Sequence, residues 1–186
     1  DGFVGIIPTF TLANYAGVFT APLTFNLYLE TIKFTLFTWA FSAFIGFWIA
    51  YFLVFHVRNQ LIAIGLFLVC TVPFWTSNII RMISWIPLLG KEGLVNSTLI
   101  GIGVIDQPLE FLLFSSFAVI VAYVHQLTIF MVVPIFNAMA RIDKRLIEAA
   151  RDNGASRFDV VRLLVLPLSK SGIALGSIFV LSIVMG

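Results

Sequence analysis

Charged residues are scarce in this chain. Only 11% of its 186 residues are Asp, Glu, Lys or Arg, whereas soluble domains contain about 25%. Apolar residues make up 60% of the sequence, and the mean hydropathy is +1.06. So few charges cannot cover a surface that faces water. The composition therefore excludes an ordinary soluble domain and predicts an integral membrane protein.

Residue types that support chemistry are equally few. The single cysteine, Cys70, can form no internal disulfide, and there is no glycine-rich phosphate-binding loop of the Walker type. The two histidines, His56 and His125, lie in different segments without a neighbouring nucleophile or metal-ligand spacing. A net charge of +2 is too small to indicate a nucleic-acid partner. We therefore expect a chain that is not an enzyme and has no catalytic residue, metal site or bound cofactor.

Four apolar segments predict membrane-spanning helices, because backbone amides in hydrocarbon must be paired within their own segment. The expected fold is an all-α, polytopic helical bundle with spans at about 30–55, 61–87, 111–140 and 171–186. The last segment has 16 residues, fewer than the roughly 20 needed for a crossing, so we expect it to be incomplete. Residues 1–28 are more polar and are expected to form an external lead-in, with a short interfacial helix around 13–19.

The basic residues are unevenly distributed along the chain. Seven of the eleven lie between Arg141 and Lys170, and Arg58 lies in the short turn between the first two spans. The segment 88–110 instead contains one lysine and three acidic residues. By the positive-inside rule, the Arg58 turn and the loop 141–170 are expected to be cytoplasmic, and the segment 88–110 external.

The cytoplasmic loop 141–170 contains signals for two short helices. Residues 142–152 are helix formers, and Asn153-Gly154 is a typical helix end. Ser156 followed by Asp159 is a capping arrangement for a second helix, expected to end at Pro167. Small residues cluster at the corner between the helices and permit close approach by another protein: Ala149, Ala150, Gly154 and Ala155. From these residues alone, a solvated basic loop that keeps the spans in register is an equally good interpretation.

The run Glu148-Ala-Ala-Arg-Asp-Asn-Gly154, followed by Leu166-Pro167, matches the EAA motif, and the chain resembles permease subunits of binding-protein-dependent ABC importers. In that family this loop is the coupling helix, which docks in a groove of the ATP-binding subunit. The resemblance implies these ATPase-coupling residues: Glu148, Ala149, Ala150, Arg151, Gly154, Ala155, Arg157 and Pro167.

The resemblance also implies how such a chain is assembled. Residues 29–186 would form the transmembrane permease domain, working with a dimer of ATP-binding subunits that holds the ATP and magnesium. A second permease subunit, forming a heterodimer, and a periplasmic solute-binding protein would complete the importer. The expected location is the bacterial inner membrane, and family members have six spans, one before this chain's start and one beyond its end.

Three further stretches look like the spermidine/putrescine-type permeases. They are Pro73-Phe-Trp-Thr-Ser77 with Arg81 and Trp85, Gly93-Leu-Val-Asn96, and Ile105-Asp-Gln-Pro-Leu109. Ile83-Ser84 departs from the aromatic-small pair that is more usual there. The expected cargo is a polyamine or similar amine-bearing solute, and a ferric ion, a phosphonate or an amino-acid-like compound is an alternative. A membrane scaffold or a membrane-embedded enzyme is the alternative from another class.

Polar residues inside or beside apolar spans usually face a cavity or another helix, because they are costly in lipid. A cationic solute would favour acidic and aromatic side chains. The candidates for the translocation path are therefore Trp75, Ser77, Asn78, Asp106, Glu110 and Tyr123. Arg81 does not suit a cation and is expected to extend to the outer headgroups. Gly172 and Gly176 form a small face that suits helix packing.

Overall fold

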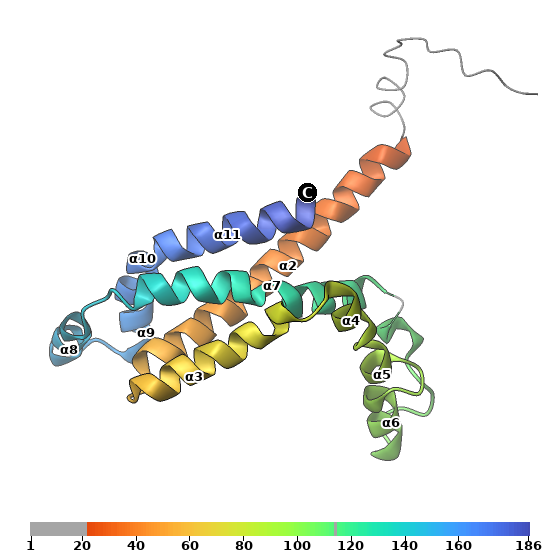
Figure 1. The fold of residues 1–186 in the computed structure, drawn as a ribbon, viewed down its shortest axis with the longest axis horizontal. Helices are drawn as coiled ribbons and strands as arrows, with labels where there is room; N and C mark the ends of the chain where they lie inside the picture. The colour runs from red at the N-terminus through yellow and green to blue at the C-terminus, as the bar shows by residue number, and fades with distance from the viewer. Residues whose placement is uncertain (1–21, 114) are drawn as a thin grey trace, which may run out of the picture. The chain divides into compact units, whose positions relative to one another are not determined.

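The structure is a computed structural model that describes residues 22–113 and 115–186 (Figure 1). Every regular element in this part of the chain is helical, which confirms the all-α fold. The chain divides into two compact units, residues 1–33 and 34–186. In the first unit the described residues belong to helix α2 (Pro22–Phe55), where Lys33 donates to Glu30 at 2.8 Å.

The expected lead-in of residues 1–28 is described only from residue 22 onward. Residues 22–28 are already part of α2, so the first predicted span begins earlier than residue 30. The interfacial helix expected around residues 13–19 lies outside the described residues.

Two helical segments are long and apolar enough to cross a membrane alone, Leu23–Phe55 and Glu110–Met139. Two bent pairs raise the number of candidate spans to four if each pair is one span. These pairs are Leu61–Trp75 with Ile79–Gly101, and Arg157–Leu168 with Lys170–Met185. The four predicted spans thus correspond to two continuous helices and two broken ones.

The second predicted span, over 61–87, is not the single helix that its hydropathy suggests. α3 (Gln60–Thr71) continues as a short 3₁₀ turn, η1 (Val72–Trp75), and the chain then bends by 95°. Three short helices follow beyond the bend: α4 (Asn78–Ile83), α5 (Ile86–Leu89) and α6 (Leu94–Gly101). Pro73 removes a helical N–H, and Thr76 has extended backbone angles, so the helix cannot continue.

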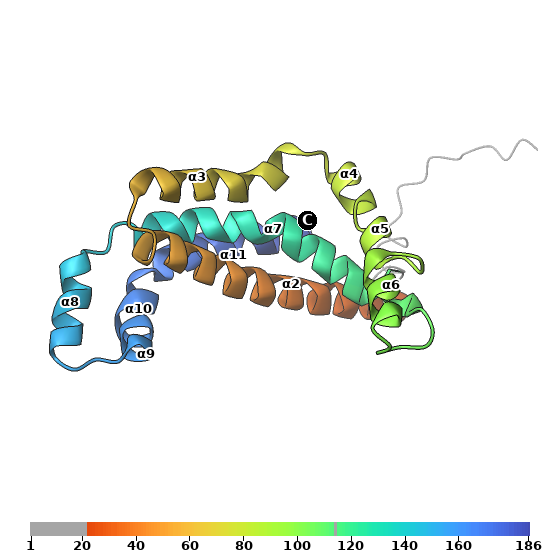
Figure 2. The ribbon, with the colours of Figure 1, turned by 90° about the horizontal axis from the view of Figure 1, so that it is seen from below.

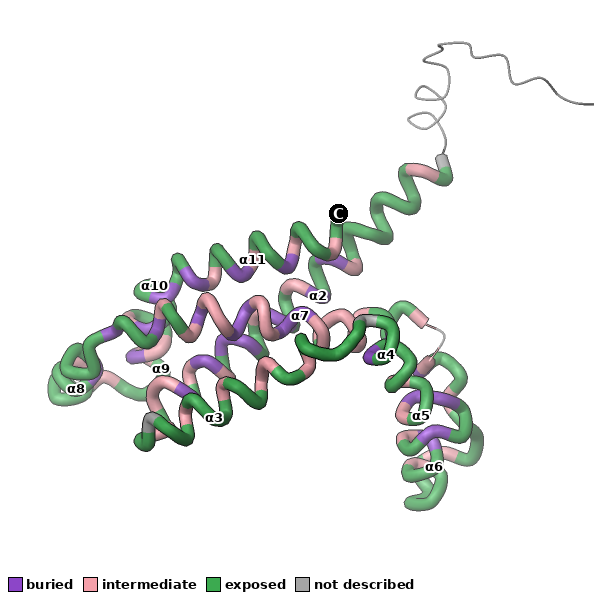
Figure 3. Tube along the Cα trace, viewed as in Figure 1, coloured by how far each residue is buried: buried purple, intermediate pink, exposed green. Residues whose placement is uncertain are grey.

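Helix α7 (Ser116–Met139), preceded by the short turn η2 (Glu110–Leu112), is the centre of the second unit. Buried residues follow it and the face of α11 (Lys170–Met185) that packs against it (Figure 3). Leu127, Met131, Ile135 and Met139 are fully buried at helical spacing. From Phe34 on, α2 packs on the same core, and its Trp39 indole donates to the Ser177 hydroxyl of α11 at 2.8 Å.

Glycines allow the helices to approach α7 closely, as predicted for Gly172 and Gly176. A Cβ at Gly172 would collide with the Pro134 carbonyl and lie 2.8 Å from the Ala138 Cβ. A Cβ at Gly176 would lie 2.7 Å from the Met131 sulfur. Gly46 of α2 approaches the Met131 Cβ in the same way, at 2.6 Å. Met131 is therefore enclosed by Gly176 of α11 and Gly46 of α2. The role of Gly46 was not recognised in the sequence.

We expect Gly172→Leu to destabilise the bundle, because the contact it would disturb is with backbone of α7 that cannot rotate away. Overpacking typically costs about 1–3 kcal/mol, so the thermal unfolding midpoint of the purified full-length protein should fall clearly. Gly65→Leu is the matched control, because Gly65 is also helical but no atom lies within 4 Å of the position that its Cβ would take. Equal midpoints for the two variants would contradict this packing role.

The last predicted span is reached through a bent connection. α8 (Lys144–Asp152) and α9 (Arg157–Val160) are followed by a π-helical turn, η3 (Val161–Val165), and by α10 (Leu166–Leu168). The second loop helix was expected to end at Pro167. Instead Pro167 lies in the first turn of α10, where a missing N–H is tolerated, and the 66° bend falls at Ser169.

Candidate functional site

The candidate site is the helical corner, defined here as residues 143–160, which contains α8, α9 and the turn between them. Its first helix begins where the Asp143 carboxylate accepts the Arg145 N–H at 2.9 Å. It ends in a left-handed turn at Gly154, whose φ is +85°. The Gly154 N–H donates to the Arg151 carbonyl at 2.8 Å, and the Ala155 N–H donates to the Ala150 carbonyl at 3.0 Å. This pair of bonds is a Schellman motif, which favours glycine at its left-handed position.

The second helix of the corner begins with the capping box that the sequence predicts. The Ser156 hydroxyl accepts the Asp159 N–H at 3.2 Å, and the Asp159 carboxylate accepts the Ser156 N–H at 3.1 Å. The Ser156 hydroxyl also donates to that carboxylate. These bonds lower the pKa of the Asp159 carboxyl below its ordinary value, with a further contribution from Arg162. Two adjoining end motifs thus fix the angle between α8 and α9.

The corner is attached to the bundle through three buried apolar side chains. Ile142, Ile147 and Val160 are at most 9% exposed and belong to the same core cluster as Met131 and Met139 of α7. Because these residues lie directly before the corner, within α8 and at the end of α9, the corner is anchored to the core of the bundle at three positions along the chain.

The outward surface of the corner combines small, charged and apolar residues. Glu148, Ala149 and Gly154 are exposed, and Ala150 and Ala155 are half-buried. Two large apolar side chains, Leu146 and Phe158, are 50% and 69% exposed. Sequence reasoning missed these two, although apolar residues within a charged loop are the pattern expected of a docking surface. Of the other predicted coupling residues, Arg151 and Arg157 are exposed, whereas Pro167 lies beyond the corner in α10.

The corner and the Arg58 turn lie at the same end of the second unit, as the positive-inside rule predicts. Both contribute to one cavity of about 420 Å³, which is lined by Arg58 from the turn and by Lys144 and Arg157 from the corner. Figure 2 shows α8 to α10 at one end of α7 and α4 to α6 at the other. The acidic segment 88–110 is thus separated from the basic loop by the length of α7.

The residues predicted to form the translocation path are not brought together. Trp75 is 83% exposed and lines a groove with Phe130 and Phe179. Tyr123 instead packs against the core cluster of α7. Glu110 forms an exposed ion pair with Lys91 at 2.6 Å. Ser77 and Asp106 are exposed elsewhere, and the side chain of Asn78 lies outside the described residues.

Arg81 does not extend to the headgroups as expected. It is only 7% exposed, and its guanidinium donates to the Pro73 carbonyl and, at 2.8 Å, to the Thr76 carbonyl. It also donates to the Thr76 hydroxyl at 3.3 Å. The Pro73 carbonyl also accepts from the Thr76 hydroxyl at 2.9 Å and the Thr76 N–H at 3.4 Å, so Arg81 joins a local network of hydrogen bonds where the helix breaks.

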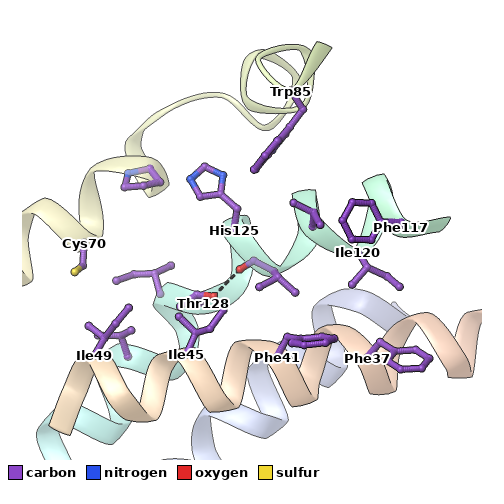
Figure 4. A pocket seen from close by; sticks show the side chains of 15 residues that line it. Phe37, Phe41, Ile45, Ile49, Cys70, Trp85, Phe117, Ile120, His125 and Thr128 are labelled. Atoms are coloured by element: carbon purple, nitrogen blue, oxygen red, sulfur yellow. Dashed lines mark hydrogen bonds between the residues drawn. The ribbon is translucent and has the colours of Figure 1, made fainter. Parts of the chain in front are cut away.

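A cavity of about 800 Å³ lies between α2, α3 and α7 (Figure 4). Phe37, Phe41, Ile45 and Ile49 line it from α2, and His125 and Thr128 face it from α7. The Trp85 ring closes one end and meets the His125 ring edge-on at 5.6 Å. The lining contains no carboxylate, and the Thr128 hydroxyl donates to the Val124 carbonyl at 2.6 Å. An unpaired cation would lose hydration here without gaining a counter-charge.

Beyond the bend, Asn96 holds the segment 88–110 together. Its side chain is fully buried, donates to the Gly90 carbonyl at 2.9 Å and accepts the Leu109 N–H at 2.8 Å. Two of the stretches that resemble the spermidine/putrescine-type permeases, those ending at Asn96 and Leu109, therefore meet in space. The hydrogen bonds of the Asn96 side chain join these two stretches across 13 positions of the sequence.

Comparison with known proteins agrees with this architecture. Residues 61–186, well over half of the chain, match the family described as "Binding-protein-dependent transport system inner membrane component". The chain is 36% identical over 177 residues to the spermidine/putrescine transport system permease protein PotB of Salmonella typhimurium, covering 95% of this chain and 60% of that protein. PotB of Escherichia coli is 35% identical over 177 residues, with 95% and 63% covered.

A third relative is the inner membrane ABC transporter permease protein YdcU of Escherichia coli. It is 27% identical over 196 residues, with 100% of this chain and 62% of that protein covered. The chain thus spans about 60% of the length of the curated relatives that it matches. The family match includes the helical corner, the broken second span and the glycine-packed α7 and α11. The chain belongs to the family of binding-protein-dependent transport system inner membrane components.

Proposed function

We propose that this chain is part of a permease subunit of an ATP-driven importer, forming half of a translocation path and coupling to a separate ATPase through the helical corner. The observation that best supports this is the construction of the corner. Its two end motifs give it a fixed shape, its buried residues attach it to the bundle, and its outward surface is apolar and charged. A loop that only joined two spans would need none of these features.

The mechanism of coupling follows from that construction. When two partner ATPases close on ATP, a corner docked on one of them is displaced with it. Because Ile142, Ile147 and Val160 are packed into the core, α7 and the attached helices rotate as a body. The permease itself binds no nucleotide in this scheme; the ATP and magnesium belong to the ATPase. Alternating access then results from movement against a second permease subunit.

The proposed cargo is a polyamine or a similar small amine-bearing solute. The relatives named as spermidine/putrescine permeases support this, as do the exposed carboxylates of Asp106 and Glu110 in the segment opposite the corner. A solute cation would have to compete with Lys91 for Glu110, which suits an entry site better than a tight binding site. The cavity between α2, α3 and α7 has no carboxylate in its lining and so offers a polyamine no counter-charge. A ferric ion, a phosphonate or an amino-acid-like compound is the alternative cargo.

The proposed surroundings are the bacterial inner membrane, with the corner and the Arg58 turn in the cytoplasm. A periplasmic binding protein would deliver the solute to the end of the second unit that contains α4 to α6. The partner permease is proposed to be a different chain, so that the assembly is a heterodimer with two ATPase subunits.

Reconstitution of the full-length protein with its genetically adjacent subunits tests this function. We expect the ATPase to co-purify, and the binding protein loaded with labelled putrescine or spermidine to stimulate both ATP hydrolysis and uptake into proteoliposomes. The unloaded binding protein is the control. Failure of any ATPase to co-purify would contradict the importer role. Uptake of a phosphonate or ferric compound, with none of a polyamine, would keep the importer and replace the cargo.

A further inference from the structure

The cavity between the Arg58 turn and the helical corner has an unusual concentration of positive charge. Its lining includes Arg58, Lys144, Arg151 and Arg157, with Glu148 as the acidic side chain. Four positive charges and one negative charge give a formal charge of +3 around about 420 Å³. Within the part of the chain that the structure describes, none of these five side chains is in an ion pair. The coupling set contains Arg151, Arg157 and Glu148 but neither Arg58 nor Lys144, so it does not account for these last two positive charges.

The residues of α8 that line the cavity lie on one face of the helix. Lys144, Ile147, Glu148 and Arg151 have the i, i+3, i+4, i+7 spacing of a single helix face, and all four line the cavity. Arg145, one position along, does not line it. The face of α8 turned toward the α2–α3 turn therefore differs from the face that presents Leu146 and Ala149, although Glu148 and Arg151 are exposed as well as lining the cavity.

The remaining walls come from a membrane-spanning helix. Tyr51 and Phe55 belong to the last two turns of α2, where their rings lie 5.2 Å apart, and His56 follows them in the turn. Both rings line the same cavity as the cations. Because α2 ends here, the cavity lies at the depth where hydrocarbon gives way to headgroups, and a tyrosine there is typical of an interfacial belt.

We propose that this cavity binds the phosphate of an anionic phospholipid headgroup. A phosphate accepts several charge-assisted hydrogen bonds from arginine and lysine, and the aromatic wall suits the glycerol and first acyl carbons that accompany it. Basic pockets between spans on the cytoplasmic side are a recurring way of recognising such lipids. The site would join the end of the first described span to the coupling helix, so lipid composition could set how firmly the corner is held.

This inference goes beyond the proposed function and does not depend on the cargo. Free inorganic phosphate would accept the same hydrogen bonds from arginine and lysine. A carboxylate of the ATPase is a third possible occupant, because the cavity is positively charged. The lipid is favoured because two walls of the cavity, Tyr51 and Phe55, come from a spanning helix rather than from the loop.

The test uses the full-length permease with its partner subunits and native mass spectrometry after exchange into phosphatidylcholine nanodiscs with increasing phosphatidylglycerol. The variant is Arg58→Gln combined with Lys144→Gln, since neither residue belongs to the predicted coupling set. Each cation near a membrane surface is worth about a fivefold change in lipid affinity, so the double variant should bind phosphatidylglycerol roughly 25-fold more weakly. Arg145→Gln, the neighbouring cation outside the cavity, should bind as the parent does. Arg58→Lys with Lys144→Arg should restore binding.

The outcomes separate the three occupants. The lipid site is supported if the parent retains phosphatidylglycerol in the presence of inorganic phosphate and the double variant loses it. If inorganic phosphate by itself displaces phosphatidylglycerol from the parent, the cavity is a site for free phosphate. Binding of lipid only when the ATPase subunits are stripped away would assign it to the ATPase and overturn the proposal. Equal lipid binding by the parent and the double variant would overturn it as well.

Discussion

Gly154→Trp is expected to remove most of the stimulation of ATP hydrolysis by loaded binding protein, while the complex still assembles and binds ATP. Gly154 has a φ of +85°, where a residue with a Cβ costs about 1–2 kcal/mol. No atom lies within 4 Å of the position that a Cβ would take, so the indole would project outward without disturbing the core. The damage therefore falls on the shape and surface of the corner, and the typical coupling range predicts a loss of about 5-fold to 150-fold.

Two further variants distinguish coupling from folding. Gly65→Trp is the control for added bulk, because Gly65 also has open space at its Cβ but lies within α3, in neither the corner nor the segment 88–110. Gly154→Asn should retain most of the stimulation, since asparagine adopts left-handed angles at lower cost. The measurement is ATPase activity of the reconstituted complex with loaded and unloaded binding protein. Parent-like stimulation in Gly154→Trp would refute the coupling role of the corner.

The corner was predictable because its signals are local. The Schellman turn at Gly154 and the capping box of Ser156 and Asp159 join atoms within five residues of one another. Such motifs need no knowledge of the rest of the fold, and the structure contains both. Its attachment through Ile142 and Ile147 could be anticipated only as apolar periodicity, because the partner residues on α7 depend on the tertiary arrangement.

The path residues were harder to place for the same reason. Hydropathy shows that a segment is apolar but not which side of it faces another helix, so it did not indicate that Tyr123, a path candidate, packs against the core. Gly172 and Gly176 were recognised from their spacing on one helix. Gly46 was not, because its significance lies in its contact with Met131, 85 positions later in the sequence. That the path candidates, Tyr123 included, contact the solute stays a prediction.

The broken second span depends on an interaction that hydropathy does not report. Sequence reasoning grouped Pro73 with Arg81 only as parts of one stretch that resembles the polyamine-type permeases, and it expected the Arg81 side chain to extend to the outer headgroups. Their connection is that the guanidinium reaches back to the carbonyls of Pro73 and Thr76. The Arg81 guanidinium, a charge that is costly in lipid, is thereby paired with backbone carbonyls, which are also costly in lipid when they have no donor.

Arg81→Met should be the most damaging single change in the second span. The methionine side chain has no donor, so the Thr76 carbonyl loses its charged donor, whereas the Pro73 carbonyl keeps the Thr76 hydroxyl at 2.9 Å and the Thr76 N–H at 3.4 Å. Losing hydrogen bonds from a charged donor costs about 1.5–3 kcal/mol, and every 1.4 kcal/mol is a tenfold change in an equilibrium. We therefore expect the bent arrangement to lose most of its population, with a large fall in solute uptake and in the unfolding temperature of the full-length protein.

Lys91→Met is the matched control, because it removes one cation from the same region but breaks only an ion pair in which both side chains are more than half exposed. Such exposed pairs contribute about 0–1 kcal/mol, so this variant should behave almost as the parent. Arg81→Lys should be intermediate, since a single ammonium has donors but lacks the planar fork that reaches two carbonyls and a hydroxyl. If Arg81→Met transported solute at the parent rate and unfolded at the same temperature, the bend would have to be held by Pro73 and the surrounding packing alone. The guanidinium would then have no structural role there.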